Sequence, residues 1–189
     1  VYLAPGVYNT TAPVEIISRV TLQGHSWGRT SIRASAGHSA IGNADSGVVT
    51  FSDPVGEPYD DLALRDITIN GGSQNLNGIC SVYTQTDATK DDLNWAGQPD
   101  HNNIIQYVQV INCYYNGVRL SYTTGSASTS WRLDHVRVFS CCDADGGYAS
   151  FNINATDIWV TNCDSGSAGS VGNSYGFICN GSDNSYTNC

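Results

Sequence analysis

A short strand-like segment ending in glycine, asparagine or serine recurs along the chain, and it limits the fold more than any other feature. Four of its copies are followed directly by a cysteine. The copies are Val20–Gly24, Ile67–Gly71, Val108–Asn112, Val136–Ser140, Ile158–Asn162 and Asn184–Asn188. A strand-and-turn unit repeated every few tens of residues is typical of a solenoid, in which each coil buries its apolar edge against its neighbours.

A second repeated segment starts with glycine and continues with alternating apolar residues. Its copies are Gly47–Phe51, Gly78–Val82, Gly117–Leu120, Gly147–Phe151 and Gly176–Cys179. This period-2 pattern predicts strands, and no stretch shows a sustained helical period. We therefore expect an all-β fold, a right-handed parallel β-helix of about six coils, as a single domain over residues 1–189. The chain contains no methionine and opens in what reads as a strand, so we expect a piece of a longer protein.

The cysteines after the first repeat predict a row of sulfurs. We expect Cys113, Cys141, Cys163 and Cys189 to lie in one register, about 4.8 Å apart on successive coils. Parallel side chains reach the disulfide dihedral poorly, which favours free thiols acting as small hydrophobes. The chain has seven cysteines, an odd number that cannot all pair within it.

Charge and hydropathy argue against a nucleic-acid partner and against a membrane span. The formal net charge is −9, and Lys90 is the single lysine. Binding to nucleic acid needs clustered lysine and arginine, so we expect no such partner. No apolar run reaches the roughly 18 residues of a membrane span, so we expect none.

Three polar regions interrupt the repeats and are predicted to be loop insertions. They cover residues 42–61, 83–103 and 164–174 and are rich in Gly, Ser, Asp and Asn. Insertions in solenoids project as loops, often on the binding face.

The opening of the chain resembles a known superfamily. Val1–Tyr8, with the sequence VYLAPGVY, followed by Val20–Gly24 and Thr30–Arg33, is similar to the start of pectate-lyase-like parallel β-helix proteins. That superfamily includes polysaccharide lyases, polygalacturonase-type hydrolases and phage tailspike depolymerases. The resemblance covers the whole chain as architecture, and it implies the fold more strongly than any one activity.

Three aspartates are the candidate catalytic residues. Asp143 and Asp145 stand two residues apart, at about 6–7 Å on a strand edge, and Asp164 follows on the next coil. Paired carboxylates at such spacings cleave glycosidic bonds. The segment from Cys142 to Tyr148 also resembles the paired-aspartate segment of polygalacturonase-type hydrolases, which implies acid and base roles for Asp143 and Asp145. Two alternatives stay open, namely ordinary turn chemistry and a calcium site formed by the three carboxylates.

Aromatic and amide side chains are the candidate carbohydrate contacts. Tyr114, Tyr115 and Asn116 follow one repeat, and Trp95 lies in a polar loop. Aromatic rings stack on sugars, although the tyrosines also suit packing beside a strand. Trp159 alternates with apolar neighbours and is predicted to point outward. With Arg137 on the preceding coil, it suggests a lateral contact surface.

His135 follows Asp134 directly, but no serine or cysteine nucleophile stands at a meaningful spacing, so the pattern does not favour a catalytic triad.

The leading expectation is an extracellular or virion-surface protein that forms a homotrimer and recognises or cleaves polysaccharide in the manner of a tailspike. The alternatives are a monomeric secreted lyase or hydrolase, and a non-catalytic adhesin or fibre. No cofactor is expected beyond the calcium alternative.

Overall fold

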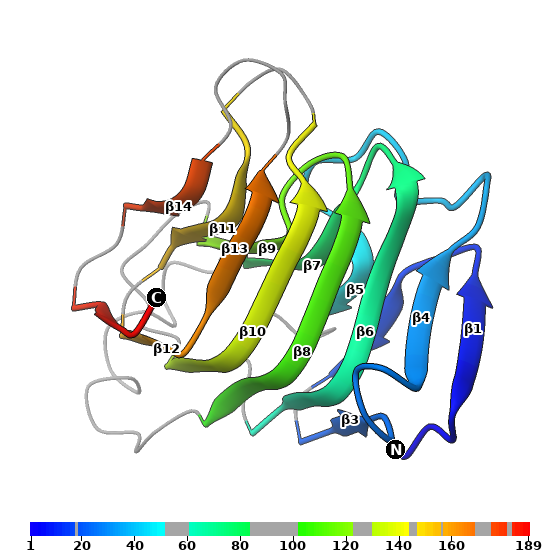
Figure 1. The fold of residues 1–189 in the computed structure, drawn as a ribbon, viewed down its shortest axis with the longest axis horizontal. Helices are drawn as coiled ribbons and strands as arrows, with labels where there is room; N and C mark the ends of the chain where they lie inside the picture. Colours follow the sequence, from blue (N-terminus) through cyan, green and yellow to red (C-terminus); the bar gives the residue numbers. More distant parts are fainter. Residues whose placement is uncertain are drawn as a thin grey trace, which may run out of the picture.

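The computed structural model describes residues 1–17, 19–51, 61–83, 102–122, 130–143, 147–155, 157–168, 175–180 and 183–189. These residues form strands and turns and no helix, so they contain no helix that is long and apolar enough to span a bilayer. All pairing between their strands is parallel, in two sheets that face one another (Figure 1). The prediction of an all-β, parallel chain is confirmed.

The larger sheet, called sheet A here, lies in front in Figure 1 and is crossed in the order β1-β4-β6-β8-β10-β12-β15, with β3 beside β6 and β13 beside β10. Its strands are β1 (Gly6–Thr10), β3 (Thr21–Gln23), β4 (Thr30–Ala34), β6 (Ala63–Gln74), β8 (Asn103–Cys113), β10 (Trp131–Cys141), β12 (Ile158–Thr161), β13 (Asp164–Ala168) and β15 (Ser185–Thr187).

The smaller sheet, sheet B, has the order β14-β11-β9-β7-β5-β2. Its strands are β2 (Val14–Ile16), β5 (Gly47–Phe51), β7 (Asn77–Tyr83), β9 (Val118–Tyr122), β11 (Ala149–Asn154) and β14 (Tyr175–Cys179). Each glycine-led segment singled out in the sequence overlaps one strand of this sheet, so those strand predictions are confirmed.

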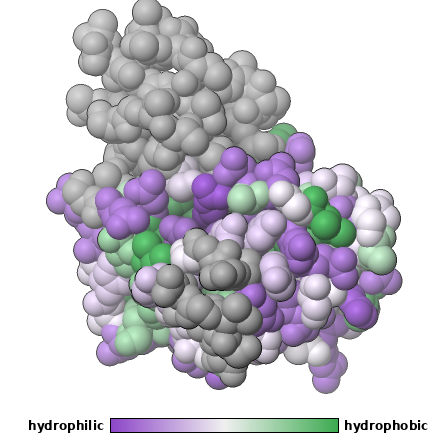
Figure 2. All heavy atoms as spheres, turned by 90° about the horizontal axis from the view of Figure 1, so that it is seen from above, coloured by the Kyte–Doolittle hydropathy of each residue, from purple (hydrophilic) through white to green (hydrophobic). Residues whose placement is uncertain are grey.

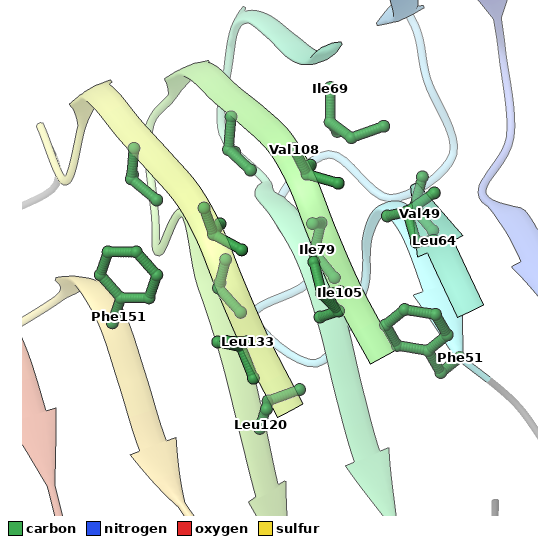
Figure 3. Packing of buried hydrophobic residues seen from close by; sticks show 14 of the residues in the cluster. Val49, Phe51, Leu64, Ile69, Ile79, Ile105, Val108, Leu120, Leu133 and Phe151 are labelled. Atoms are coloured by element: carbon green, nitrogen blue, oxygen red, sulfur yellow. The ribbon is translucent and has the colours of Figure 1, made fainter. Parts of the chain in front are cut away.

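The chain passes back and forth between the two sheets as it advances. Each strand therefore pairs with a strand from the next pass, which is the arrangement of a β-helix-like solenoid. The apolar side chains point into the space between the sheets. Figure 3 shows Leu64, Ile105 and Leu133 of sheet A facing Ile79 and Leu120 of sheet B. This continuous row of buried residues is the core that the alternating pattern predicted.

Sheet A bends along a row of residues in the left-handed conformation. The register places these residues opposite one another on successive strands, and their φ angles are 56°, 52°, 54°, 54° and 54° for Asp66, Tyr107, His135, Asn162 and Asn188. A second left-handed row, Ser73, Asn112 and Ser140, lies at the ends of the long strands. Each long strand therefore has two straight halves separated by one turn residue.

These two rows correct the register expected from the sequence. Asn112 and Ser140 belong to the second row, whereas Asn162 and Asn188 belong to the first. The six repeated segments are therefore not in one register. Both halves of a long strand carry the same alternating apolar pattern, and Tyr107 in the first row lacks the Gly or Asn that usually marks a left-handed turn.

The cysteine row is corrected for the same reason. Cys113 and Cys141 are neighbours at the second row, where the Cys142 amide donates to the Cys113 carbonyl at 3.1 Å. Cys163 lies at the first row, where its Sγ is 3.8 Å from the Leu133 carbonyl oxygen. All seven cysteines are free thiols, as the sequence favoured. The four cysteines of the predicted row are divided between the two bends, because Cys113 and Cys141 follow the second row and Cys163 and Cys189 follow the first.

The third predicted loop also begins differently. Asp164–Ala168 is strand β13, paired with the second half of β10, so the predicted loop at 164–174 begins with a strand. Gly166 allows this close pairing, because a Cβ there would lie 2.4 Å from the Phe139 ring. The predicted loop at 42–61 contains strand β5, and its residues 52–60 lie outside the described residues. Nearly all of the predicted loop at 83–103 also lies outside them. Figure 2 shows a largely polar surface with separate apolar patches over the described residues.

Candidate functional site

Two of the three predicted catalytic aspartates, Asp143 and Asp164, lie at different levels of sheet A. Asp164 lies opposite Arg137 on β10, whereas Asp143 follows the end of that strand at Cys141. About 13 Å of strand separates the level of Arg137 from Cys141. The expectation that Asp164 reaches the pocket of Asp143 is therefore wrong. Asp143 is exposed, and Asp145 lies outside the described residues.

Asp164 instead belongs to a cluster on the second half of sheet A. Its carboxylate is 3.3 Å from the Arg137 guanidinium. That guanidinium lies over the Phe139 ring at 4.9 Å and over the Trp27 ring at 5.8 Å. Contact with two aromatic rings restrains the arginine, and both charged side chains stay about half exposed. A planar charged group flanked by rings suits a polar ligand such as a sugar.

The predicted carbohydrate contacts divide into two groups. Tyr115 stacks on Tyr148 with ring centroids 4.8 Å apart, and Tyr114 meets Tyr115 edge-on at 6.1 Å. These rings are half-buried and Tyr148 packs on the core, which fits the packing alternative raised for the tyrosines. Trp95 lies outside the described residues.

Asn116 is buried and cannot contact a glycan, so its predicted role is wrong. It is 1% exposed, and its Nδ2 donates to Asn77 Oδ1 at 2.9 Å. Its Oδ1 accepts from the Ala149 amide at 3.0 Å and from Asn152 at 3.2 Å. Every polar atom of this side chain is used inside the solenoid, because an unpaired buried amide is costly. Asn116 is part of an internal amide ladder along sheet B.

A pocket of about 540 Å³ opens on the outer face of sheet A, over the first halves of β8 and β10 and over β12. Its lining includes Asn103, Ser130, Arg132, Trp159 and Thr161. Trp159 points outward, as predicted, and is 47% exposed. Its register partner is Arg132 and not Arg137, so the surface expected from Trp159 and Arg137 is corrected. The Arg132 guanidinium forms no hydrogen bond or ion pair with any described residue.

A buried carboxylate lies beside this pocket. Asp134 is 7% exposed and accepts hydrogen bonds from Gln106 at 3.0 Å, Thr161 at 3.0 Å and Asn162 at 3.1 Å. Burial by itself raises the pKa of Asp134, but these hydrogen bonds and one from His135 outweigh it and lower the pKa to about 2. Thr161 lines the pocket as well, so the hydrogen-bond network of Asp134 reaches the pocket wall.

His135 completes this network. Its Nδ1 lies 2.8 Å from Asp134 Oδ1. An ionised carboxylate only accepts hydrogen bonds, so Nδ1 carries the proton and Nε2 keeps a free lone pair. The imidazole rests on the Tyr107 ring, with centroids 4.8 Å apart, and its side chain is 43% exposed. The structure therefore holds a histidine in one tautomer and one orientation at the surface.

Sequence reasoning named Asp134 and His135 but assigned them no role. Adjacent strand residues point to opposite faces, so a hydrogen bond between them was not expected. The sequence did offer one signal, an aspartate followed directly by a histidine. Its meaning depends on His135 being in register with Tyr107 and Asp66, and that register cannot be read from the sequence.

Neither a metal-binding cluster nor a known relative points to a further assignment. Among the described residues, no cluster of three His, Cys, Asp or Glu side chains is arranged to hold a metal ion. Comparisons with models of protein families, with curated proteins and with solved structures found no match to this chain. The geometry of sheet A is therefore the basis for a functional proposal.

Proposed function

We propose that this chain is a surface polysaccharide-binding protein that holds a glycan along the outer face of sheet A. In this proposal the two sheets belong to a right-handed parallel β-helix of about six coils, located outside the cell or on a virion. The observation that supports it most is Trp159, a half-exposed tryptophan at the wall of a pocket of about 540 Å³. A rigid, amphipathic ring of this kind stacks on the apolar face of a sugar.

Two further observations support a glycan that carries acidic groups. Four of the eight basic residues of this acidic chain lie on strands of sheet A, namely Arg33, Arg65, Arg132 and Arg137. Arg132 adjoins Trp159 and has no acidic partner among the described residues. A planar guanidinium binds carboxylate or sulfate in a bidentate manner, so Trp159 and Arg132 together suit an acidic sugar.

Binding to a panel of neutral and acidic polysaccharides, measured by affinity electrophoresis, tests this proposal. Trp159→Ala is expected to weaken binding by at least about 30-fold, the effect of losing a central aromatic anchor of about 2 kcal/mol. Tyr175→Ala is the matched control, because Tyr175 is 46% exposed but lies on sheet B. If the polysaccharide slows the migration of both variants and of the wild type equally, the Trp159 pocket is ruled out as the glycan site.

Depolymerisation is the second part of the proposal. Release of reducing ends from a bound polysaccharide, abolished by Asp143→Asn with Asp145→Asn, would assign cleavage to the aspartate pair. Binding without release would place the protein among receptor-binding proteins.

The exposed Trp159 also supports a second candidate, an interface between copies of this chain in a trimer. Large exposed apolar side chains on a flat strand face favour association. Sedimentation velocity distinguishes the two, because an interface role predicts that Trp159→Ala is monomeric whereas a glycan role predicts an unchanged sedimentation coefficient.

A further inference from the structure

We propose that His135 is a general base that activates water for ester hydrolysis, with Asp134 as its positioning residue. The substrate class we infer is an O-acylated glycan held in the pocket lined by Trp159. That choice of substrate rests on the proposed function, whereas the role of His135 rests on its own geometry.

The protonation states follow from the hydrogen bonds. Asp134 accepts from Gln106, Thr161 and Asn162 as well as from His135, and these donors favour the ionised carboxylate. Because ionised Asp134 can only accept a hydrogen bond, the single proton of the neutral imidazole lies on Nδ1. Nε2 is then the basic atom, as in enzymes whose catalytic histidine is oriented by an aspartate. No nucleophilic side chain is needed if water is the nucleophile.

The imidazole is also fixed in direction. Tyr107 supports one face of the ring at 4.8 Å between centroids, and the hydrogen bond to Asp134 fixes the Nδ1 edge. With 43% of the side chain exposed, the opposite edge is open to solvent. A base must be both accessible and held, because a freely rotating imidazole spends little time in a reactive orientation.

The pocket is connected to this base through Thr161. Thr161 lines the pocket and donates to the same Asp134 oxygen that His135 contacts. Trp159 precedes Thr161 by two residues on the same face of β12, which puts the two side chains about 6–7 Å apart. His135 does not line the pocket but is in register with Asn162, about 10 Å along the strand from Trp159. A glycan of more than one sugar that is stacked on Trp159 and follows the strand therefore extends toward His135.

Ester hydrolysis fits these groups better than cleavage of a glycosidic bond. Glycosidases use two carboxyl groups, one of which is protonated to donate to the leaving oxygen. Here Asp134 is held ionised, Asp164 is paired with Arg137, and Asp66 accepts from Gln23 at 2.9 Å. Hydrolysis of an ester by water needs only one base that takes a proton and later returns it.

The reaction balances with water as the sole co-reactant. His135 Nε2 takes one proton from water while the water oxygen forms a bond to the acyl carbon. The resulting tetrahedral intermediate breaks the bond from the acyl carbon to the sugar oxygen. That oxygen takes the proton back from Nε2, which leaves a free hydroxyl on the glycan and a carboxylic acid.

Hydrolysis of p-nitrophenyl acetate tests the base without requiring a glycan. We expect the rate of His135→Gln to fall on the order of 100-fold below wild type, the lower range for loss of a positioned base. The control is His25→Gln, because His25 is also exposed but contacts a neutral group, the Tyr2 hydroxyl, at 2.9 Å. His25→Gln is expected to keep the wild-type rate. Equal rates for His135→Gln and wild type would overturn the proposal.

Nitrogen-15 NMR of the histidine side chains tests the positioning role independently of activity. We expect His135 in the wild type to carry its proton on Nδ1, and Asp134→Asn to populate the other tautomer. A wild-type His135 protonated on Nε2 would overturn the proposal.

The glycan substrate is tested by acetate release from an acetylated polysaccharide. We expect the wild type to release acetate and both His135→Gln and Trp159→Ala to lose this activity. The two proposals can fail separately. If only His135→Gln loses p-nitrophenyl acetate hydrolysis, and neither the wild type nor any variant binds glycan, the proposed function is rejected while the role of His135 as a general base is retained.

Discussion

Asp134 and His135 are adjacent in sequence, yet their side chains meet on one face of sheet A with 2.8 Å between Oδ1 and Nδ1. Successive strand residues normally point to opposite faces. The φ of 54° at His135 breaks this alternation and turns the imidazole back toward Asp134. The bend of β10 and the hydrogen-bonded pair are therefore one structural feature, and changes to it affect both stability and chemistry.

Asp134→Asn is predicted to destabilise the fold at neutral pH. The carboxylate accepts from Gln106, Thr161, Asn162 and His135, and the amide replaces an ionised acceptor with a group that also donates. With the pKa lowered to about 2, ionised Asp134 contributes about 2 kcal/mol. Urea unfolding at pH 7 should show a loss of that size. Asp164→Asn, which removes an exposed ion pair, should change stability by less than about 1 kcal/mol.

The difference in stability between the wild type and Asp134→Asn is predicted to depend on pH. The folded-state pKa of Asp134 lies below the value in the unfolded chain, so its stabilisation is fully present above about pH 4. It is lost as the pH falls toward 2, where the carboxyl is protonated in both states. The stability gap between wild type and Asp134→Asn should therefore close between about pH 4 and pH 2. A gap that is constant over this range would contradict the assignment.

Asn116→Ala is predicted to be strongly destabilising. It removes the acceptor of the Ala149 amide and of Asn152, and the donor to Asn77 Oδ1. Each buried polar group left without a partner costs about 1–3 kcal/mol, so we expect a total of roughly 2–4 kcal/mol in urea unfolding. Asn180→Ala is the control, because Asn180 is exposed and its backbone hydrogen bond to Ile153 is retained. Similar stability of both variants would show that the ladder is not structural.

Sheet B was the most predictable part of the fold. Each of its last five strands carries a local signal, a glycine followed by alternating apolar residues. The glycine has a physical reason at Gly78 and Gly117, where an added Cβ would lie 2.2 Å from Val110 and from Val138 of sheet A. A signal that arises from one position and its near neighbours can be recognised in a single sequence.

The register of sheet A and the candidate site were not predictable in the same way. Tyr107 and His135 take the left-handed conformation without being Gly or Asn, so the bend is invisible in the apolar pattern. Asn116 reads as a polar loop residue but is buried, because its partners Asn77 and Asn152 come from other passes of the chain. Contacts of this kind depend on the register between coils, which no local pattern specifies.

Gly78→Ala is predicted to destabilise the fold through steric overlap alone. The new Cβ would also lie 2.7 Å from the Gly117 carbonyl oxygen, and the φ of Gly78 is outside the left-handed region. Overpacking of a filled core costs roughly 1–3 kcal/mol. Gly28→Ala is the control, since nothing lies within 4 Å of its added Cβ, and it should shift stability by no more than about 0.5 kcal/mol. Thermal unfolding followed by circular dichroism measures both. A neutral Gly78→Ala would mean that sheets A and B lie further apart at this point.

The thiols are predicted to react with Ellman's reagent in two classes. Cys179 and Cys189 are exposed, whereas the other five cysteines are buried. Burial raises the pKa of Cys80, Cys142 and Cys163 to about 12, so these thiols hold almost no reactive thiolate at pH 8. Two thiols should therefore react in the native protein and all seven in denaturant. Cys179→Ser should lower both numbers by one. More than two fast thiols in the native wild type would contradict the burial of the other five cysteines.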